Sequence, residues 1–180
     1  MSPDLTTPWK DFLEDIDSLL DESFKLHCIG GFAAVMGYGL PRSTNDLDYL
    51  SLVPYGRISD LQRLAGPGSA LARKHKIHMQ YTAVASMPEN YEERLTELFP
   101  AHFKYLRIFV PDPYDLVLSK LSRNMERDRE DVQYLAKTCH LSPAILRERY
   151  TTELRPILIG DVKRHDLTLD LWIAAYLASL

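Results

Sequence analysis

Cysteine is scarce in this chain of 180 residues, which contains only Cys28 and Cys139. The two lie far apart within apolar segments, without the C-x-x-C spacing of a zinc or redox site. We therefore expect reduced thiols rather than a disulfide framework. The six histidines form no H-x-H or H-E-x-x-H pair, which argues against a zinc site.

Long hydrophobic runs are also absent. No segment approaches the roughly 20 apolar residues that a membrane-spanning helix requires, and the amino-terminal stretch lacks a basic region followed by an apolar run. We expect a cytoplasmic protein without membrane contacts. The net charge is only −4, so no global basic field indicates nucleic-acid binding, although short basic stretches occur at residues 73–76 and in the carboxy-terminal tail.

The apolar residues that are present predict alternating helices and strands. The spacing of apolar residues, the Gly and Pro breaks and the capping residues predict helices over 8–20, 32–38, 58–65, 70–75 and 90–99, and strands over 25–29, 46–53, 78–84 and 105–110. From Pro113 onward the pattern is helical. Strands separated by helices, followed by a helical tail, predict an α/β (α+β) fold in which helices flank a small mixed β-sheet.

Two carboxylates stand one residue apart in Asp46-Leu47-Asp48, at the start of a predicted strand. Successive side chains of a strand point to opposite faces, so both carboxylates face one side and Leu47 faces the core. Two such anions repel unless a cation or hydrogen bonds hold them charged. Mg²⁺ suits them, because it binds one or two carboxylates together with water and phosphate oxygens.

A diglycine turn, Gly30-Gly31, lies between the preceding strand and helix. Glycine lets the backbone approach a bulky anion, and N–H groups at the start of a helix can bind phosphate. Arg42 and Ser43 or Thr44 add a guanidinium and hydroxyl donors just before the carboxylates. The alternatives are an ordinary tight turn at the glycines and a plain loop with Asx turns before Asp46.

These residues resemble the signature of the nucleotidyltransferase superfamily, an h-G-[GS] turn followed by D-x-[DE] on the next strand. A fuller pattern, in which the diglycine is followed in order by Ala, Gly, Arg, Thr and the two aspartates of D-h-D, resembles that of AbiEii-type nucleotidyltransferase-like toxins. The matching positions here are Gly30, Gly31, Ala33, Gly37, Arg42, Thr44, Asp46 and Asp48.

A second block supports the closer resemblance. Residues 113–121 read PYDLVLSKL and residues 128–132 read DREDV. They resemble the family's Pro followed by a helix that carries D-L-h-x-x-K-L, and its D-x-x-D-h segment. The resemblance implies that Lys120 and either Asp131 or Asp128 act in the active site. The alternative is a surface helix with ordinary charge pairs, since the run from Arg123 to Glu130 mixes both signs.

The resemblance implies transfer of a nucleotidyl group from a nucleoside triphosphate, with Mg²⁺, to a hydroxyl of RNA (the tRNA 3′ end) or of protein. It also implies an antitoxin partner in a toxin-antitoxin or phage-defence pair. We expect residues 1–112 to form the nucleotidyltransferase-like α/β core and residues 113–180 a helical region that completes the active site.

One departure from the superfamily matters. Many members take a third carboxylate from a later strand, and residues 78–81 (HMQY) offer none. The alternative function is therefore a catalytically silent binding or regulatory module. A glycosyltransferase, which also uses D-x-D, ranks below both because that fold needs a longer chain.

Overall fold

The computed structural model describes residues 5–177, and these residues belong to two compact units. The sheet unit comprises residues 1–84 and 95–110, and the helical unit comprises residues 85–94 and 111–180. Each unit has its own secondary structure and its own buried side chains, so each is described by itself. The domain boundary between residues 112 and 113 stays a prediction.

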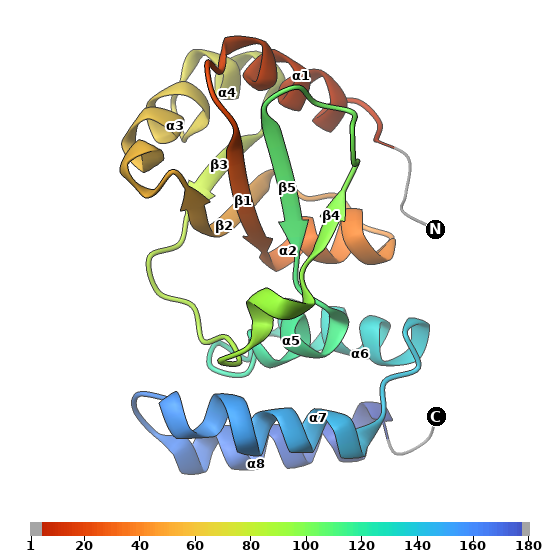
Figure 1. Cartoon of the computed structure of the whole chain (residues 1–180). Coiled ribbons are helices and arrows are strands. Elements are labelled where there is room, and N and C mark those ends of the chain that lie inside the picture. Colours follow the sequence, from red (N-terminus) through yellow and green to blue (C-terminus); the bar gives the residue numbers. More distant parts are fainter. Residues whose placement is uncertain (1–4, 178–180) are drawn as a thin grey trace. The chain divides into compact units, whose positions relative to one another are not determined.

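A five-stranded mixed sheet forms the centre of the sheet unit (Figure 1). The strand order is β3-β2-β1-β5-β4; β1 pairs antiparallel with β2 and parallel with β5, β2 pairs parallel with β3, and β4 pairs antiparallel with β5. The strands are β1 (Phe24–Ile29), β2 (Asp46–Val53), β3 (His78–Tyr81), β4 (Thr96–Leu98) and β5 (Leu106–Val110). The predicted mixed sheet is confirmed.

Helices α1 (Trp9–Leu19), α3 (Ile58–Ala65) and α4 (Ala70–His75) gather at the end of the sheet where β1 begins (Figure 1). The apolar positions of α1 recur every three or four residues, which places Trp9, Phe12, Leu13 and Ile16 on one buried face. Helix α2 (Gly30–Phe32) directly follows β1 and continues through a wider π-type turn over Ala33–Gly37.

A β-bulge between His27 and Cys28 adjusts the pairing of β1 with β2. Leu26 pairs with Leu52, whereas Cys28 pairs with Tyr49. Strict alternation would send Tyr49 and Leu52 to opposite faces, because they are an odd number of residues apart. The bulge absorbs the mismatch, and both side chains are fully buried.

The predicted helix over residues 90–99 is wrong. Only a short 3₁₀ turn, Tyr91–Arg94, forms there, and Thr96–Leu98 is strand β4. Leu98 pairs with Ile108 of β5, and Glu97 forms an ion pair with Arg107. Strand pairing with a partner later in the chain has overridden the local helical pattern, which is a tertiary effect.

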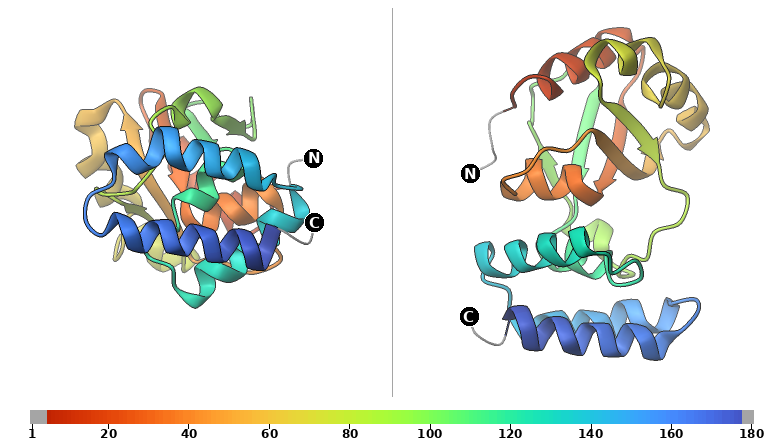
Figure 2. Two further views of the ribbon diagram at one scale, coloured as in Figure 1. Left: turned by 90° about the horizontal axis from the view of Figure 1, so that it is seen from below. Right: turned by 180° about the vertical axis from the view of Figure 1, so that it is seen from behind.

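The helical unit consists mainly of α5 (Pro113–Leu118), α6 (Glu126–Thr138), α7 (Pro143–Arg149) and α8 (Val162–Trp172). Helices α7 and α8 run side by side (Figure 2), and an ion pair of 2.7 Å joins Arg147 to Asp170. Asp112 caps α5, since its carboxylate accepts a hydrogen bond from the Asp115 N–H. The helical carboxy-terminal part is thereby confirmed.

A network of charges around the buried Asp115 links several segments of the helical unit. Asp115 is fully buried and accepts two hydrogen bonds from Arg94, of 2.8 and 3.1 Å. Arg94 also donates to Glu153, and Arg149 donates to Asp115. Burial raises the pKa of Asp115 in spite of these cations.

Among residues 5–177, no helix is both long and apolar enough to cross a membrane.

Candidate active site

Strand β2 presents its two acidic side chains on one face. Asp46 and Asp48 are half-buried, whereas Leu47 and Tyr49 are fully buried. Leu47 and Tyr49 face α3, and Gln62 of α3 donates a hydrogen bond of 2.9 Å to the Tyr49 hydroxyl. Both carboxylates therefore point away from the α3 side, as their spacing in the sequence predicts.

The first glycine of the turn lies against the second of these carboxylates. Asp48 pairs with Ile29 at the end of β1, directly before Gly30. A Cβ atom on Gly30 would lie 2.6 Å from Oδ2 of Asp48, and Gly30 has φ of +68°. Any other residue would be strained and would overlap the carboxylate, so both the backbone and the site require glycine here.

The second glycine lies against the basic loop. A Cβ on Gly31 would lie 3.0 Å from an Nη atom of Arg42 and 3.0 Å from Oγ1 of Thr44. Thr44 in turn donates a hydrogen bond of 2.9 Å to Oδ1 of Asp46. The diglycine turn, one guanidinium, one hydroxyl and two carboxylates thus form a single cluster, which we call the acidic face: Gly30, Gly31, Arg42, Thr44, Asp46 and Asp48.

Residues 9–172 match a family model described as "Nucleotidyltransferase of unknown function (DUF6036)". The chain belongs to this nucleotidyltransferase family. It is accordingly an enzyme of the nucleotidyltransferase class, and its substrate includes a nucleotide. A comparison of this chain with curated proteins found no match, and a comparison with solved structures found none either.

The donor set of the nucleotidyltransferase suits a hard divalent cation. Enzymes of this kind typically use such an ion. Within residues 5–177, no three His, Cys, Asp or Glu side chains converge to form a complete protein cage. Mg²⁺ does not need one, because it retains water and takes further oxygens from substrate phosphates. The half-buried carboxylates of Asp46 and Asp48 fit that requirement.

In the helical unit, the second predicted block forms a buried ionic cluster. Lys120 is 3% exposed, and its Nζ lies 2.9 Å from Oδ2 of Asp131 and 3.8 Å from Oδ1 of Asp128. Both aspartates are also buried. The interpretation of this block as a solvent-exposed charged face is therefore wrong for these three residues, and the cluster is a specific internal arrangement.

Asp128 has a visible structural task in the nucleotidyltransferase. Its carboxylate accepts a hydrogen bond of 3.0 Å from the Met125 N–H at the start of α6, and further hydrogen bonds from the Arg123 guanidinium. Burial opposes ionisation, yet these hydrogen bonds hold the pKa of Asp128 below its ordinary value. Asp128 thereby fixes the side chain of Arg123, which remains 59% exposed.

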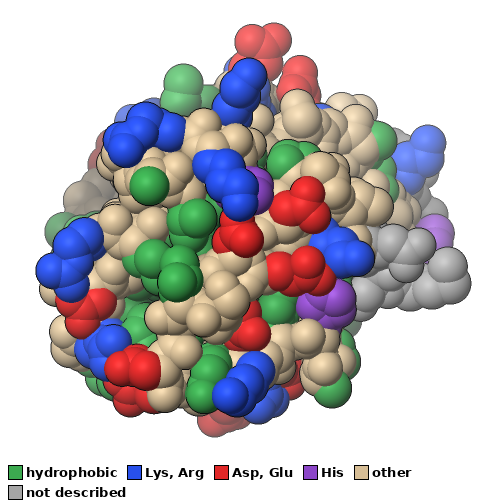
Figure 3. Space-filling view, turned by 90° about the horizontal axis from the view of Figure 1, so that it is seen from above, with side chains coloured by type: hydrophobic (Ala, Val, Ile, Leu, Met, Phe, Trp, Pro, Cys, Tyr) green, Lys and Arg blue, Asp and Glu red, His purple; other side chains and the backbone are tan. Residues whose placement is uncertain are grey.

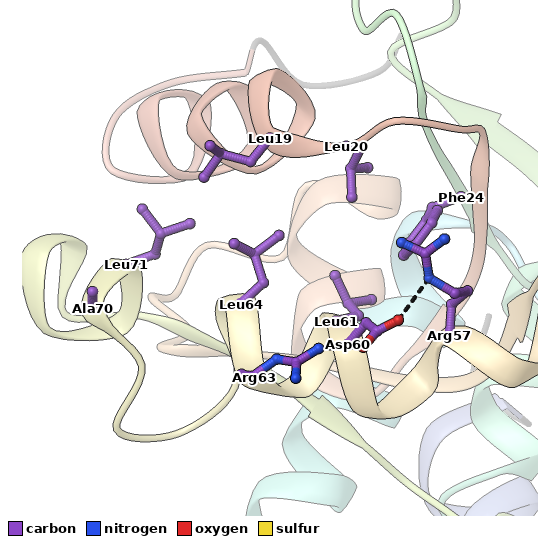
Figure 4. A pocket seen from close by; sticks show the side chains of 10 residues that line it. All are labelled: Leu19, Leu20, Phe24, Arg57, Asp60, Leu61, Arg63, Leu64, Ala70 and Leu71. Carbon is purple, nitrogen blue, oxygen red and sulfur yellow. Dashed lines mark hydrogen bonds and ion pairs between the residues drawn. The ribbon is translucent and has the colours of Figure 1, made fainter.

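A separate cavity of about 520 Å³ lies between α1, α3 and α4 (Figure 4). In Figure 4, Leu19, Leu64 and Leu71 point toward one another across it. Its two arginines pair with Asp60, and hydrophobic side chains reach the surface on this side of the molecule (Figure 3). Its lining includes Phe24, which is five residues, or about 16 Å along β1, from the end that meets Asp48. The cavity is therefore distinct from the acidic face and offers little to a polyphosphate.

Sequence reasoning looked to residues 78–81 for a third carboxylate but could not show which of them lie beside the acidic pair. His78 and Gln80 pair directly with Asp46 and Asp48 through the parallel register of β3 and β2. The predicted strand over residues 78–84 identified the segment, but the identity of its neighbour depends on long-range pairing. Only the sheet order could show that these two residues flank the carboxylates.

Proposed function

We propose that this enzyme is a Mg²⁺-dependent nucleotidyltransferase that moves an NMP group from an NTP to a hydroxyl acceptor. The observation that carries the proposal is the contact between the diglycine turn and the acidic pair, with Gly30 against Asp48 and Gly31 against Arg42 and Thr44. Family membership supports the reaction class. The cation, the NTP and the acceptor are our proposals.

In the proposed reaction, the acceptor hydroxyl attacks the α-phosphorus in line, and the bond to the departing pyrophosphate breaks. Asp46 and Asp48 hold the cation, and Thr44 orients Asp46 through its hydrogen bond. The backbone around Gly30-Gly31 and the guanidinium of Arg42 bind the triphosphate. When bound, Mg²⁺ neutralises negative charge on the phosphate oxygens.

We propose roles for the helical unit from the resemblance of its sequence. Lys120 balances the charge of the leaving pyrophosphate, and Asp131 accepts the proton of the attacking hydroxyl. Their 2.9 Å contact gives each a charged partner in the absence of substrate. Asp128 contributes to substrate binding through Arg123, whose exposed guanidinium it holds in place.

The acceptor hydroxyl belongs to RNA, such as the tRNA 3′ end, or to a protein. RNA binding needs Lys and Arg side chains that neutralise phosphates. Four cations of the two basic stretches are instead paired with carboxylates: Lys74 with Asp15, Arg147 with Asp170, Arg149 with Asp112, and Arg155 with Asp166. These pairs favour a protein acceptor.

We also propose an AbiEii-like toxin role, in which a cognate antitoxin protein controls the enzyme. The support is the match of Arg42, Thr44, Asp46 and Asp48 to the AbiEii-type pattern. Expression in a bacterial host tests it directly. We expect growth arrest with the wild-type chain and normal growth with Asp46→Asn; equal growth with both would reject the toxin role.

The reaction itself is tested with each of the four α-³²P-labelled NTPs, Mg²⁺ and a bacterial extract, with ribonuclease and protease digestion to separate RNA-bound from protein-bound label. We expect Asp46→Asn and Asp48→Asn each to abolish transfer. Asp21→Asn is the matched control, because Asp21 is an exposed aspartate of the same unit with 76% side-chain exposure. Full transfer by either site variant would reject the assignment.

The alternative is a catalytically silent binding or regulatory module, and the missing third carboxylate favours it. Calorimetry separates the two proposals. The enzyme should bind NTP tightly only with Mg²⁺, and Asp48→Asn should remove that dependence. Weak or Mg²⁺-independent binding by the wild-type chain, together with no labelled acceptor, would establish the silent module instead.

A further inference from the structure

Strand β3 lies beside the acidic pair and carries no carboxylate. The pairing of β3 with β2 fixes which of its residues lies next to each aspartate. Strand β3 runs parallel to β2, with His78 opposite Asp46 and Gln80 opposite Asp48. Neighbouring strands lie about 4.8 Å apart, and directly paired residues point to the same face. Met79 and Leu47, the pair between them, are both fully buried on the other face. Gln80 thus lies beside Asp48 on the acidic face.

The register of β3 is fixed beyond these pairs. The His78 N–H donates a hydrogen bond of 3.1 Å to the Asn45 carbonyl, and the Thr82 N–H donates one of 2.8 Å to the Tyr49 carbonyl. A slip by one residue would expose Met79 and break both bonds. The side chain next to Asp48 is therefore the carboxamide of Gln80.

Charge balance on the acidic face then favours a single ion. Asp46 and Asp48 carry two negative charges, which one divalent cation neutralises. The Arg42 guanidinium lies over Gly31 in the same cluster and adds a positive charge. Gln80 adds no negative charge, and neither does His78, which lies opposite Asp46 on the same face. A second divalent ion would therefore meet a net positive surface and be repelled.

We propose that Gln80 limits the acidic face to one divalent cation in the nucleotide-free enzyme, so that any second ion must arrive with the phosphates of the NTP. This inference rests on the proposed function, because it assumes that Asp46 and Asp48 hold a cation. It makes Gln80 the residue that determines how many ions the protein itself holds. A carboxylate in its place supplies the third charge that a second ion needs.

Mn²⁺ binding to the full chain without nucleotide tests the proposal, with free Mn²⁺ measured by electron paramagnetic resonance and stoichiometry by calorimetry. We expect one ion for the wild-type chain and none for Asp46→Asn. Gln80→Glu should bind a second ion at least about tenfold more tightly than the wild-type chain does. Gln133→Glu, an exposed position on α6, adds the same charge elsewhere and should leave the isotherm unchanged.

The outcomes separate this inference from the proposed function. Two ions of similar affinity on the wild-type chain would overturn the inference and leave the proposed function intact. A single ion on both Gln80→Glu and the shorter Gln80→Asp, each shown to be folded by circular dichroism, would do the same. No binding to the wild-type chain would overturn the acidic pair as a cation site, and both proposals with it.

Discussion

Gly30 and Asp48 are in contact: a methyl group on Gly30 would lie 2.6 Å from Oδ2 of Asp48. The end of β1 and the start of β2 thus meet through a backbone atom and a carboxylate. Gly30 also has φ of +68°, a region that side-chain-bearing residues adopt at a cost of about 1–2 kcal/mol. A change in the diglycine turn will therefore also change the position of the acidic pair.

The two glycines should respond differently to substitution. Gly30→Ala strains the backbone and displaces Asp48, so we expect at least about a hundredfold loss of nucleotidyl transfer. Gly31→Ala meets the Arg42 guanidinium and the Thr44 hydroxyl at 3.0 Å, a tight distance that a small shift relieves, and Gly31 has no positive φ, so we expect a smaller loss. Gly56→Ala is the control, because a Cβ there has no neighbour within 4 Å. Equal effects of Gly30→Ala and Gly56→Ala would contradict the geometry.

Lys120 should stabilise the fold apart from any catalytic role. Lys120→Met leaves Asp128 and Asp131 buried without the ammonium, and we expect a loss of about 3–5 kcal/mol in the free energy of unfolding. Urea denaturation measures it. Lys137→Met, at an exposed position on α6, should change stability by less than about 0.5 kcal/mol. Similar stability of the two variants would show that the buried cluster contributes nothing.

Cation binding should stabilise the folded chain. At a Mn²⁺ concentration ten times the Kd, we expect about 1.4 kcal/mol of added stability, seen as a higher Tm. Asp48→Asn should show no such gain, whereas Asp21→Asn should behave like the wild-type chain. A Tm that rises equally in Asp48→Asn would place the cation elsewhere.

Asp166 should contribute to stability in a pH-dependent way. Hydrogen bonds from Arg155 and Tyr150 lower the pKa of Asp166 to about 2. Because the folded pKa is depressed, the contribution is complete well above the unfolded pKa of about 3.9 and is lost as pH falls toward 2. In urea denaturation, Asp166→Asn should be less stable than the wild-type chain at pH 7, with the gap narrowing below about pH 4. A gap that is constant from pH 7 to pH 3 would contradict this.

Local pattern was a good guide where a segment interacts mainly with its own neighbours. The alternation through Asp46, Leu47 and Asp48 predicted the orientation of both carboxylates, since the period of two follows from backbone geometry. It was a poor guide at residues 90–99. There Arg94 binds Asp115 and Leu98 pairs with Ile108, and neither partner is near in the chain.

The sequence alone determined the fold class, the face shared by Asp46 and Asp48, and the diglycine turn before them, because helical and strand periodicity and the special backbone freedom of glycine are local properties. Tertiary structure alone decided that Gly30 contacts Asp48, that Gln80 lies beside the acidic pair, and that Lys120 is buried against two aspartates. Strand order and burial depend on contacts between residues distant in the chain, and no short-range pattern encodes those contacts.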